Sequence, residues 1–515
     1  MQTIERWGVC EVEVKGPREG NPFVDHHIEG SFWGAQERVR AEGFYDGDGT
    51  YRIRFMPSFE GDYSYEICAD FLDEPVRGSF LVLSPSKENH GPVRVSGQYH
   101  FAYEDGTPYY PMGTTCYVWN HQSDTLIEDS LRSLEEAGFN KLRFCVLPKH
   151  FDYNLHEPRS YPFEGTPMDS GVLTGDNYYE YTGDRGGNHF DKTRFRPEHF
   201  RHIEQCILAL QKLGIEADLI MMHPYDRWGF SQMTHEEDAL YWHYCVARFS
   251  AFRNVWWSLA NEYDLLKEKT LQDWEFYADV LIQKDPYHHL RSIHHCVYQY
   301  DYARPWITHC SLQRAAWEAA DYRRQYGKPV VLDEMAYEGN IPWPWGNITG
   351  EEMVRRFWEA LIRGGYPGHG ETYLGHKALL HGKETEVLWW SHGGKLYGES
   401  WKRVRFLLDV LKEAPGCGLM PDHDMFNVPM ATIEGSAGEA KPYYLIYYGI
   451  LQPIEGVVEI DRQTPYRVQL IDTWHMSIED MGIHKGRMHL SMPGRQYMAL
   501  RLTRVDDRQG GQGNI

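Results

Sequence analysis

The sequence NVWWSLANEYD, residues 254–264, says most about the architecture of this chain. It is a mostly apolar run of strand-forming residues that stops abruptly at Asn261 and Glu262. A pattern with helical spacing precedes it at residues 235–252, and another follows at residues 271–285. A short apolar strand between two amphipathic helices is typical of a β/α unit whose strand is buried on both faces.

The same alternation recurs along the middle of the chain. Short apolar segments, mostly separated by amphipathic helices, predict an α/β fold of the (β/α)8 TIM-barrel type over residues 93–415. The alternative is a doubly wound open sheet, which normally carries a glycine-rich fingerprint after its first strand, and the sequence has none there. The eight predicted strands are residues 109–119, 140–148, 216–224, 254–264, 291–297, 306–313, 328–340 and 366–374.

The segments on both sides of the predicted barrel have sequence patterns typical of β-domains. Residues 1–92 contain alternating segments such as YRIRFMP and YSYEICADF, punctuated by glycine- and aspartate-rich turns. This pattern predicts an N-terminal immunoglobulin- or fibronectin-like β-sandwich. Residues 416–515 return to strands such as KPYYLIYYG and YRVQLIDTW, which predict a C-terminal β-sandwich that ends in a frayed tail.

The net charge of the chain bears on which kinds of macromolecule it can bind. The chain of 515 residues carries 52 lysines and arginines against 74 aspartates and glutamates, a formal net charge of −22. Phosphate binding needs a basic surface, so this excludes nucleic acid and an anionic membrane as partners. No run of about eighteen apolar residues occurs, and no membrane span is predicted. Self-association into a homo-oligomer stays open.

Cysteine usage and the start of the chain bear on the compartment. The nine cysteines include no CxxC pair, which favours free thiols in a reducing compartment. Glu5 and Arg6 interrupt any apolar stretch of a secretory signal, so a cytoplasmic location is predicted. No ligand spacing typical of a metal site is present, and adjacent histidines on a strand point to opposite faces. We therefore predict no metal and no cofactor.

Two glutamates stand where predicted strands end. Glu262 closes the fourth strand, and Glu334 closes the seventh, 72 residues later. The C-terminal ends of barrel strands surround the active site, and two facing carboxylates are what cleavage of a glycosidic bond requires. Taken singly, Glu262 could instead begin the next helix, and Glu334 could pair with a lysine or arginine. Their joint placement favours catalysis.

These segments resemble a known family. WWSLANEYD and KPVVLDEMAYEGN look like the strand-four and strand-seven signatures of clan A glycoside hydrolases, which are retaining (β/α)8 barrels. HFAYEDGTPYYPMGTTCYVW and GGYPGHGETY resemble most closely the apiosidase-like branch of that clan. GFYDGDGTYRIRFMPSFEGDYSYE looks like the small sandwich that often precedes such barrels.

The resemblance implies roles for particular residues. Glu262 would be the acid/base and Glu334 the nucleophile, with Asn261 contacting the 2-hydroxyl of the substrate. Arg143 matches the strand-two arginine that braces the nucleophile. Many clan members also place a tyrosine beside the nucleophile from strand six, whereas here His309 is the polar group predicted on that strand.

Further polar and aromatic residues follow the predicted strands and are candidates for binding a sugar through hydrogen bonds or ring stacking. Of the 17 tryptophans, 14 lie within residues 93–415, which predicts a sugar pocket lined by tryptophan. Core packing is the alternative for each of these residues. The remaining predicted substrate-binding residues are Trp119, His121, His223, Trp228, His309, His369, Glu371 and Trp390.

The sequence therefore predicts an exo-acting, retaining glycoside hydrolase that cleaves a terminal sugar from a small oligosaccharide or glycoside. The long loop at residues 154–193 would help to wall one end of the cleft. There are two alternatives: a transglycosylase or phosphorylase on the same barrel, and a carbohydrate-binding protein without catalytic activity. The motifs GxSxG and GxxxxGK[ST] are absent from the sequence, which excludes serine hydrolases of that type and P-loop enzymes.

Overall fold

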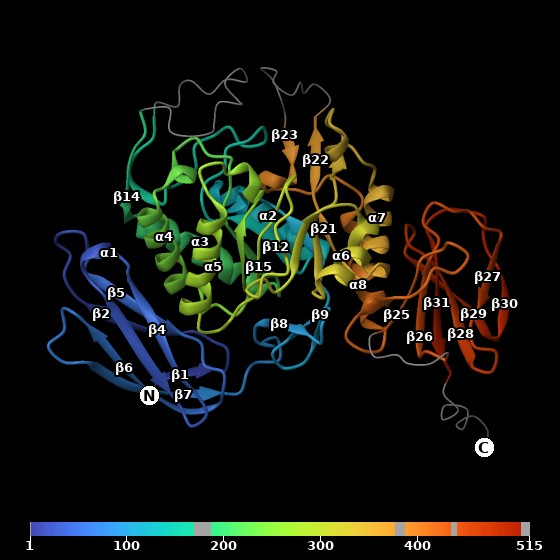
Figure 1. Ribbon diagram of the computed structural model, residues 1–515, viewed down its shortest axis with the longest axis horizontal. Coiled ribbons are helices and arrows are strands. Elements are labelled where there is room, and N and C mark those ends of the chain that lie inside the picture. Colours follow the sequence, from blue (N-terminus) through green and yellow to red (C-terminus); the bar gives the residue numbers. More distant parts are fainter. Residues whose placement is uncertain (1, 169–186, 376–386, 434–439, 506–515) are drawn as a thin grey trace.

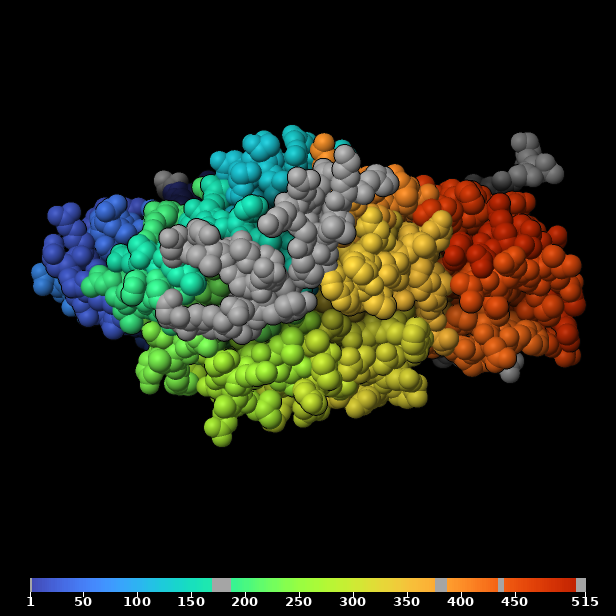
Figure 2. All heavy atoms as spheres, turned by 90° about the horizontal axis from the view of Figure 1, so that it is seen from above, coloured from blue at the N-terminus to red at the C-terminus, as the bar shows by residue number. Residues whose placement is uncertain are grey.

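The chain folds into a central barrel with a β-rich region at each end (Figures 1 and 2). The computed structural model describes residues 2–168, 187–375, 387–433 and 440–505. The N-terminal strands lie at one end of the row, and the C-terminal strands lie at the other end. Within the described residues no helix is both long and apolar enough to cross a membrane.

The barrel is a sheet of eight parallel strands in the order β17-β16-β15-β12-β11-β21-β19-β18. A parallel bridge between His294 and Ser311 joins its two ends. The predicted (β/α)8 barrel is confirmed, and each predicted strand contains one strand of the observed barrel. The barrel strands are β11 (Gly113–Thr115), β12 (Lys141–Cys145), β15 (Glu216–Met222), β16 (Val255–Ala260), β17 (Arg291–Ser292), β18 (Cys310–Gln313), β19 (Val330–Glu334) and β21 (Tyr366–His369).

Amphipathic helices surround the strands (Figure 1). Their N-termini follow capping rules: the Thr234 and Thr270 hydroxyls each accept from the third helical N–H, and an acid at that position reaches back. The helices are α2 (Asp124–Ala137), α3 (Pro197–Lys212), α4 (His235–Phe249), α5 (Leu271–Lys284), α6 (Ala319–Tyr326), α7 (Gly350–Ile362) and α8 (Trp401–Lys412).

A small antiparallel sheet closes the bottom of the barrel. It consists of β8 (Val93–Ser96), β9 (His100–Tyr103) and β10 (Pro108–Tyr109), and it lies under the barrel in Figure 1. The ring of Phe101 packs at 5.3 Å from both Trp256 and Tyr366. The lower end is thus filled by side chains, which leaves the upper end for a cavity.

Short strands extend the upper end of the barrel. They form a hairpin and a three-stranded sheet of order β20-β22-β23, and several of them connect directly to barrel strands. These strands are β13 (Phe163–Thr166), β14 (His189–Phe195), β20 (Glu338–Gly339), β22 (Glu371–Leu374) and β23 (Val387–Trp389).

The N-terminal region is a folded sheet of seven strands in the order β1-β7-β6-β3-β4-β5-β2. Strand β4 pairs with β3 along its first half and with β5 along its second, so the sheet doubles over. Phe32 and Phe55 stack at 4.6 Å between the two layers. The strands are β1 (Gln2–Glu5), β2 (Cys10–Lys15), β3 (Ile28–Trp33), β4 (Arg38–Tyr45), β5 (Thr50–Phe55), β6 (Gly61–Ala69) and β7 (Val76–Leu83), with the short α1 (Pro22–Asp25).

Buried charges fasten this sandwich to the barrel. The guanidinium of Arg54, from β5, donates to Glu204 of α3 at 2.7 and 3.0 Å. Arg248 of α4 donates to Glu204 at 2.7 Å and to Asp46 at 2.8 Å. Arg54 also donates to the Arg248 carbonyl at 2.7 Å. Because all four residues are buried, two arginines and two acids balance each other across the contact.

The C-terminal region is a second sandwich. A six-stranded sheet faces a two-stranded one, and Tyr447 stacks on Trp358 of α7 at 5.7 Å, which docks the sandwich on the barrel. The strands are β24 (Leu419–Pro421), β25 (Met430–Ile433), β26 (Tyr443–Tyr447), β27 (Glu455–Glu459), β28 (Pro465–Asp472), β29 (Ser477–Lys485), β30 (Arg487–Ser491) and β31 (Met498–Arg504).

Candidate active site

Glu262 and Glu334 line one cavity of about 300 Å³ at the upper end of the barrel. Glu262 follows β16, Glu334 ends β19, and each is only 6% exposed. Most of the other residues that line the cavity come from the segments beyond the barrel strands, and about half are aromatic. They are Tyr117, Lys149, Phe151, Tyr153, Tyr225, Cys296, Gln313, Ala336, Tyr337, Trp345, Thr372, Trp389 and Ser391.

A chain of polar contacts connects the two carboxylates. The Asn261 amide donates to Glu262 at 3.2 Å, and Arg143 Nη1 donates to the Asn261 oxygen at 2.7 Å. The same Nη1 atom lies 3.5 Å from Glu334 Oε1. Arg143 therefore orients Asn261 and supplies a positive charge beside Glu334, in a place that excludes most water.

Tyrosine hydroxyls hold both carboxylates. Tyr117, two residues after β11, donates to Glu334, and its oxygen lies 3.4 Å from that of Tyr337. Tyr225 donates to Glu262. The hydroxyls around Glu334 thus come from the loops after β11 and β19. The sequence pattern instead suggests a polar group, His309, from the sixth predicted strand, which contains β18.

Glu262 is set apart by its backbone and by its acidity. Its φ of 54° and ψ of 55° place a non-glycine residue in the left-handed region, a strained conformation that is frequent at functional positions. Burial and the neighbouring charge of Glu334 raise the pKa of Glu262 to about 7, while Lys149 opposes the rise. Near neutral pH this carboxyl can therefore both give and accept a proton.

A bulge brings two consecutive acids of β19 to the barrel interior. The β18–β19 register slips between Ser311 and Gln313, so the alternation of faces is broken there. Asp333 accepts from Lys141 at 2.8 Å and from Ser311 at 2.5 Å, directly below Glu334. Against the effect of burial, Lys141 and Arg143 hold the pKa of Asp333 below its ordinary value. The strict alternation of a regular strand would point Asp333 away from Glu334, and the bulge overturns that expectation.

Lys149 was not identified from the sequence. It lies in the loop after β12 and is 3% exposed, with its Nζ 3.4 Å from the ring centre of Tyr117 and 4.2 Å from that of Tyr225. Burial lowers the pKa of Lys149. A cation held between the two tyrosines that bind Glu262 and Glu334 acts on both carboxylates. Its position just beyond a predicted strand was the signal available in the sequence.

The tryptophans predicted to line the pocket lie elsewhere among the described residues. Trp119 packs on Phe144, and the Trp228 indole donates to Glu157. The Trp390 indole donates to Thr114 at 2.9 Å. The cavity is lined instead by Trp345 and by Trp389, which precedes Trp390. The prediction for these three tryptophans is wrong because neighbouring residues at a strand end point in different directions. Composition does not show which of them faces the cavity.

The predicted histidines also lie outside the cavity. His121 stacks on His199 at 5.6 Å, and His223 lies 3.2 Å from the Leu147 carbonyl. His309 precedes β18, so it lies at the lower end of the strand, 5.3 Å from Trp256.

The last two predicted residues, His369 and Glu371, are buried beside Glu338. Of the predicted loop wall at 154–193, residues 169–186 lie outside the described residues.

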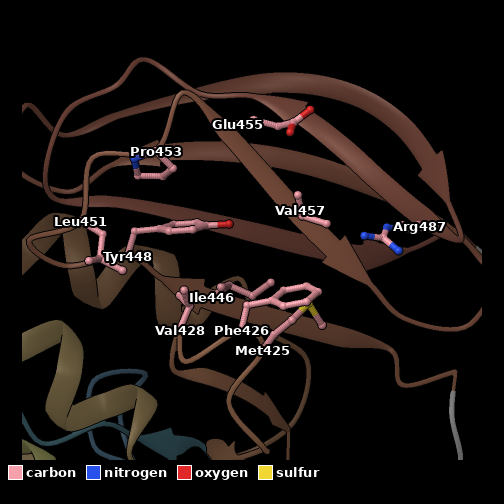
Figure 3. Close-up of a pocket in the computed structure, with 10 residues that line it drawn as sticks. All are labelled: Met425, Phe426, Val428, Ile446, Tyr448, Leu451, Pro453, Glu455, Val457 and Arg487. Carbon is pink, nitrogen blue, oxygen red and sulfur yellow. The ribbon is translucent and has the colours of Figure 1, made fainter.

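A second cavity, of about 330 Å³, lies in the C-terminal sandwich (Figure 3). Its lining is mainly apolar, with residues such as Phe426, Ile446 and Tyr448, and its charged groups are Glu455 and Arg487. It has a single carboxylate in its lining and therefore lacks the pair that glycosidic cleavage uses.

Known families and structures match this chain along most of its length. The model described as "Apiosidase-like, catalytic domain" matches residues 95–413, which is more than half of the chain. The flanks match two models described as "Domain of unknown function", DUF5060 at residues 3–70 and DUF5605 at residues 430–503. No match was found among the curated proteins.

Solved structures of glycoside hydrolases share the fold. One from Bacteroides vulgatus, described as a glycoside hydrolase, is 37% identical with a TM-score of 0.88, over 98% of this chain and all of that one. A family 5 glycoside hydrolase from the same organism has a TM-score of 0.58 at 16% identity, over 82% of this chain and 94% of its own. This chain therefore belongs to the apiosidase-like family, and its catalytic barrel is that of a clan A glycoside hydrolase.

Proposed function

We propose that this enzyme is a retaining, exo-acting glycoside hydrolase with Glu334 as nucleophile and Glu262 as acid/base. One observation carries the proposal: both glutamates line the same cavity in different electrostatic settings. Glu334 lies 3.5 Å from the Arg143 guanidinium, so a positive charge stands beside the proposed nucleophile. Glu262 has a pKa of about 7, so a large fraction carries a proton at neutral pH. This division suits a nucleophile and an acid.

The proposed reaction has two displacements. In the first, Glu334 attacks the anomeric carbon while Glu262 protonates the leaving oxygen. The ester that forms removes the charge of Glu334, one of the two causes that raise the pKa of Glu262. The pKa of Glu262 should then fall, so that it can take a proton from the water that cleaves the ester. Arg143 and Asn261 keep the two carboxyl groups in position during both displacements.

The size and lining of the cavity support cleavage of a terminal sugar. Its volume of about 300 Å³ is at the lower end of small-molecule sites, which span about 300–1,000 Å³. Tyr153, Trp345 and Trp389 present aromatic surface to it, and such rings stack on the apolar faces of sugars. We infer a small oligosaccharide or glycoside as substrate.

A panel of aryl glycosides tests this proposal. We expect hydrolysis in water of one or a few sugars, and NMR of the first-formed product should show the same anomeric configuration as the substrate. Inversion would contradict the double displacement. Turnover that depends on added phosphate or on a sugar acceptor would instead identify a phosphorylase or a transglycosylase. Release of internal fragments from long chains would contradict exo action.

The pH dependence should follow Glu262. Its protonated form is the active acid, so kcat/KM should fall as the pH rises through about 7. Lys149 lowers the pKa of Glu262, and its replacement in Lys149→Met should raise that pKa and move the basic limb to higher pH. The control is Lys267→Met at an exposed lysine, which should leave the profile unchanged. A basic limb that stays in place, or moves to lower pH, in Lys149→Met contradicts this role.

We also propose that the enzyme works in the cytoplasm on imported fragments. All nine cysteines are free thiols in the structure, and most of them are buried. Secreted proteins tend to pair their cysteines, so free thiols favour a reducing compartment. Fractionation of the native cells with an antibody to this protein tests the location, and recovery from the culture medium would contradict it.

A further inference from the structure

Glu338, His369 and Glu371 form a buried cluster beside the cavity, the β20–β22 cluster. They lie on three neighbouring strands, β20, β21 and β22, and each is at most 1% exposed. Glu338 and Glu371 are partners in the parallel pairing of β20 with β22. One donor atom from each residue lies within 4.8 Å of the others. Three groups able to bind a metal ion thus converge in a place closed to solvent.

Two polar atoms of the cluster face each other without a hydrogen bond. His369 Nε2 and Glu371 Oε1 are 3.5 Å apart, and both are buried and unpartnered in the described structure. A hydrogen bond from a histidine to a carboxylate is about 2.7–2.9 Å long, so a shared proton does not explain this spacing. A buried polar atom left unpaired costs about 1–3 kcal/mol. Something is therefore expected to sit between them.

The surroundings of His369 favour a lone pair at Nε2. The Thr114 hydroxyl accepts from the Trp390 indole at 2.9 Å and can donate to the His369 carbonyl at 3.3 Å. Its remaining lone pair can accept from His369 Nδ1, 3.0 Å away. This arrangement satisfies every group and puts the ring hydrogen on Nδ1. Nε2 then offers a lone pair to the cluster, as in histidines that bind metals.

The charge of the cluster also lacks a counterpart. Within the described part of the chain, neither Glu338 nor Glu371 forms an ion pair with a lysine or arginine. Hydrogen bonds do reach them. Glu338 accepts four, from the Tyr373 hydroxyl at 2.9 Å, the Glu399 N–H at 2.7 Å, and the N–H and hydroxyl of Ser400 at 3.0 and 2.5 Å. Glu371 Oε2 accepts two, from the N–H groups of Tyr397 at 2.7 Å and Gly398 at 3.0 Å, whereas its Oε1 accepts none from the described residues. These bonds orient the carboxylates but carry no full positive charge. Two ionised carboxylates buried side by side repel each other, and a cation between them would remove that repulsion.

We propose that the β20–β22 cluster binds one divalent transition-metal ion, with Zn²⁺ as the best match. Metal–ligand distances of about 2.0–2.2 Å in a tetrahedral site place two ligand atoms about 3.3–3.6 Å apart. His369 Nε2 and Glu371 Oε1, at 3.5 Å, match that spacing. One imidazole nitrogen with two carboxylate oxygens is a donor set that Zn²⁺ accepts, and nitrogen donors favour it over Ca²⁺ and Mg²⁺. No ligand spacing in the sequence predicts this site, because its three residues converge only in the folded barrel.

The ion would have a structural role. Glu338 is the residue after Tyr337, and Glu371 precedes Thr372, and both of these neighbours line the cavity. A metal bound to the β20–β22 cluster would join the loop that follows β19 to the strands that follow β21. It would stiffen one wall of the cavity without touching the sugar.

Metal analysis of the wild-type enzyme tests the proposal directly. The full-length protein, purified without metal affinity resin, should contain about one Zn²⁺ per chain by mass spectrometry. Removal by a chelator should lower Tm by several degrees, because the ion binds only the folded state. Added Zn²⁺ should restore Tm, Mn²⁺ should restore part of the shift, and Ca²⁺ should restore none of it.

Two substitutions and one control locate the ion. His369→Gln and Glu371→Gln keep side-chain size and should each lose Zn²⁺ and its effect on Tm. Glu216→Gln is the control, because Glu216 is also buried but lies at the lower end of β15 with the Trp256 indole as its partner. It should keep the ion. The proposal is overturned if the wild-type enzyme neither contains nor binds Zn²⁺, and this result does not depend on whether the variants fold. It is also overturned if both variants bind as much Zn²⁺ as the wild-type enzyme does.

Discussion

Glu334→Ala is expected to lower kcat by at least about 10⁴-fold on every substrate, because the first displacement loses its nucleophile. The loss should not depend on the leaving group, since bond formation at the anomeric carbon fails whatever departs from it. The fold should survive, because Glu334 ends its strand at the cavity and its neighbours Arg143 and Tyr117 retain other partners. Far-ultraviolet circular dichroism and Tm check that point.

Azide distinguishes the loss of the nucleophile from general damage. In Glu334→Ala, azide can enter the vacated space and attack the anomeric carbon directly, which gives a glycosyl azide of inverted configuration. Glu275→Gln, a change in a carboxylate of α5 that binds Tyr300, is the control and should retain activity within about twofold. Activity of Glu334→Ala near the wild-type level would show that another group is the nucleophile.

Glu262→Ala should show the second largest effect, and a different pattern. Hydrolysis of glycosides with poor leaving groups should fall about 10²–10⁴-fold, the usual contribution of general acid catalysis. Aryl glycosides with good leaving groups need no protonation, so their first displacement should persist and the ester on Glu334 should accumulate. A burst of released phenol followed by slow turnover is the expected kinetic trace, and intact-mass spectrometry should detect the ester.

The stereochemistry with azide then separates the two proposed roles. In Glu262→Ala, azide attacks the ester on Glu334 and should yield a glycosyl azide of retained configuration, opposite to the product of Glu334→Ala. The basic limb near pH 7 should also disappear, because the group that titrates there is gone. Azide products with the two configurations exchanged would mean that the roles of Glu262 and Glu334 are reversed.

The barrel was predictable because its signal is repeated. Each buried strand reads as a short apolar run between amphipathic helices, so an error in one unit does not change the fold. The same logic located Glu262 and Glu334, since a carboxylate at the end of a buried strand is placed by the strand itself. Both line one cavity.

The remaining lining could not be predicted, because it depends on local geometry that the strand pattern does not encode. The β19 bulge turns Asp333 inward, and Trp389 faces the cavity while Trp390 binds Thr114. Tyr225 and Lys149 stand on irregular loops, where no periodicity reports the direction of a side chain. A hydrogen bond or cation–π contact to a residue distant in sequence becomes visible only in three dimensions.

The charges shared by Arg54, Glu204 and Arg248 limit how this protein can be divided. Trimming the gene to the barrel segment alone would remove Arg54 and Asp46 and leave Arg248 and Glu204 on a newly exposed face. Arg248 and Glu204 would keep each other as partners but would lose Asp46 and Arg54, and with them the charge network that joins the sandwich to the barrel. Expression, crystallisation or directed evolution should therefore begin from the undivided chain, in which all four charges keep their partners.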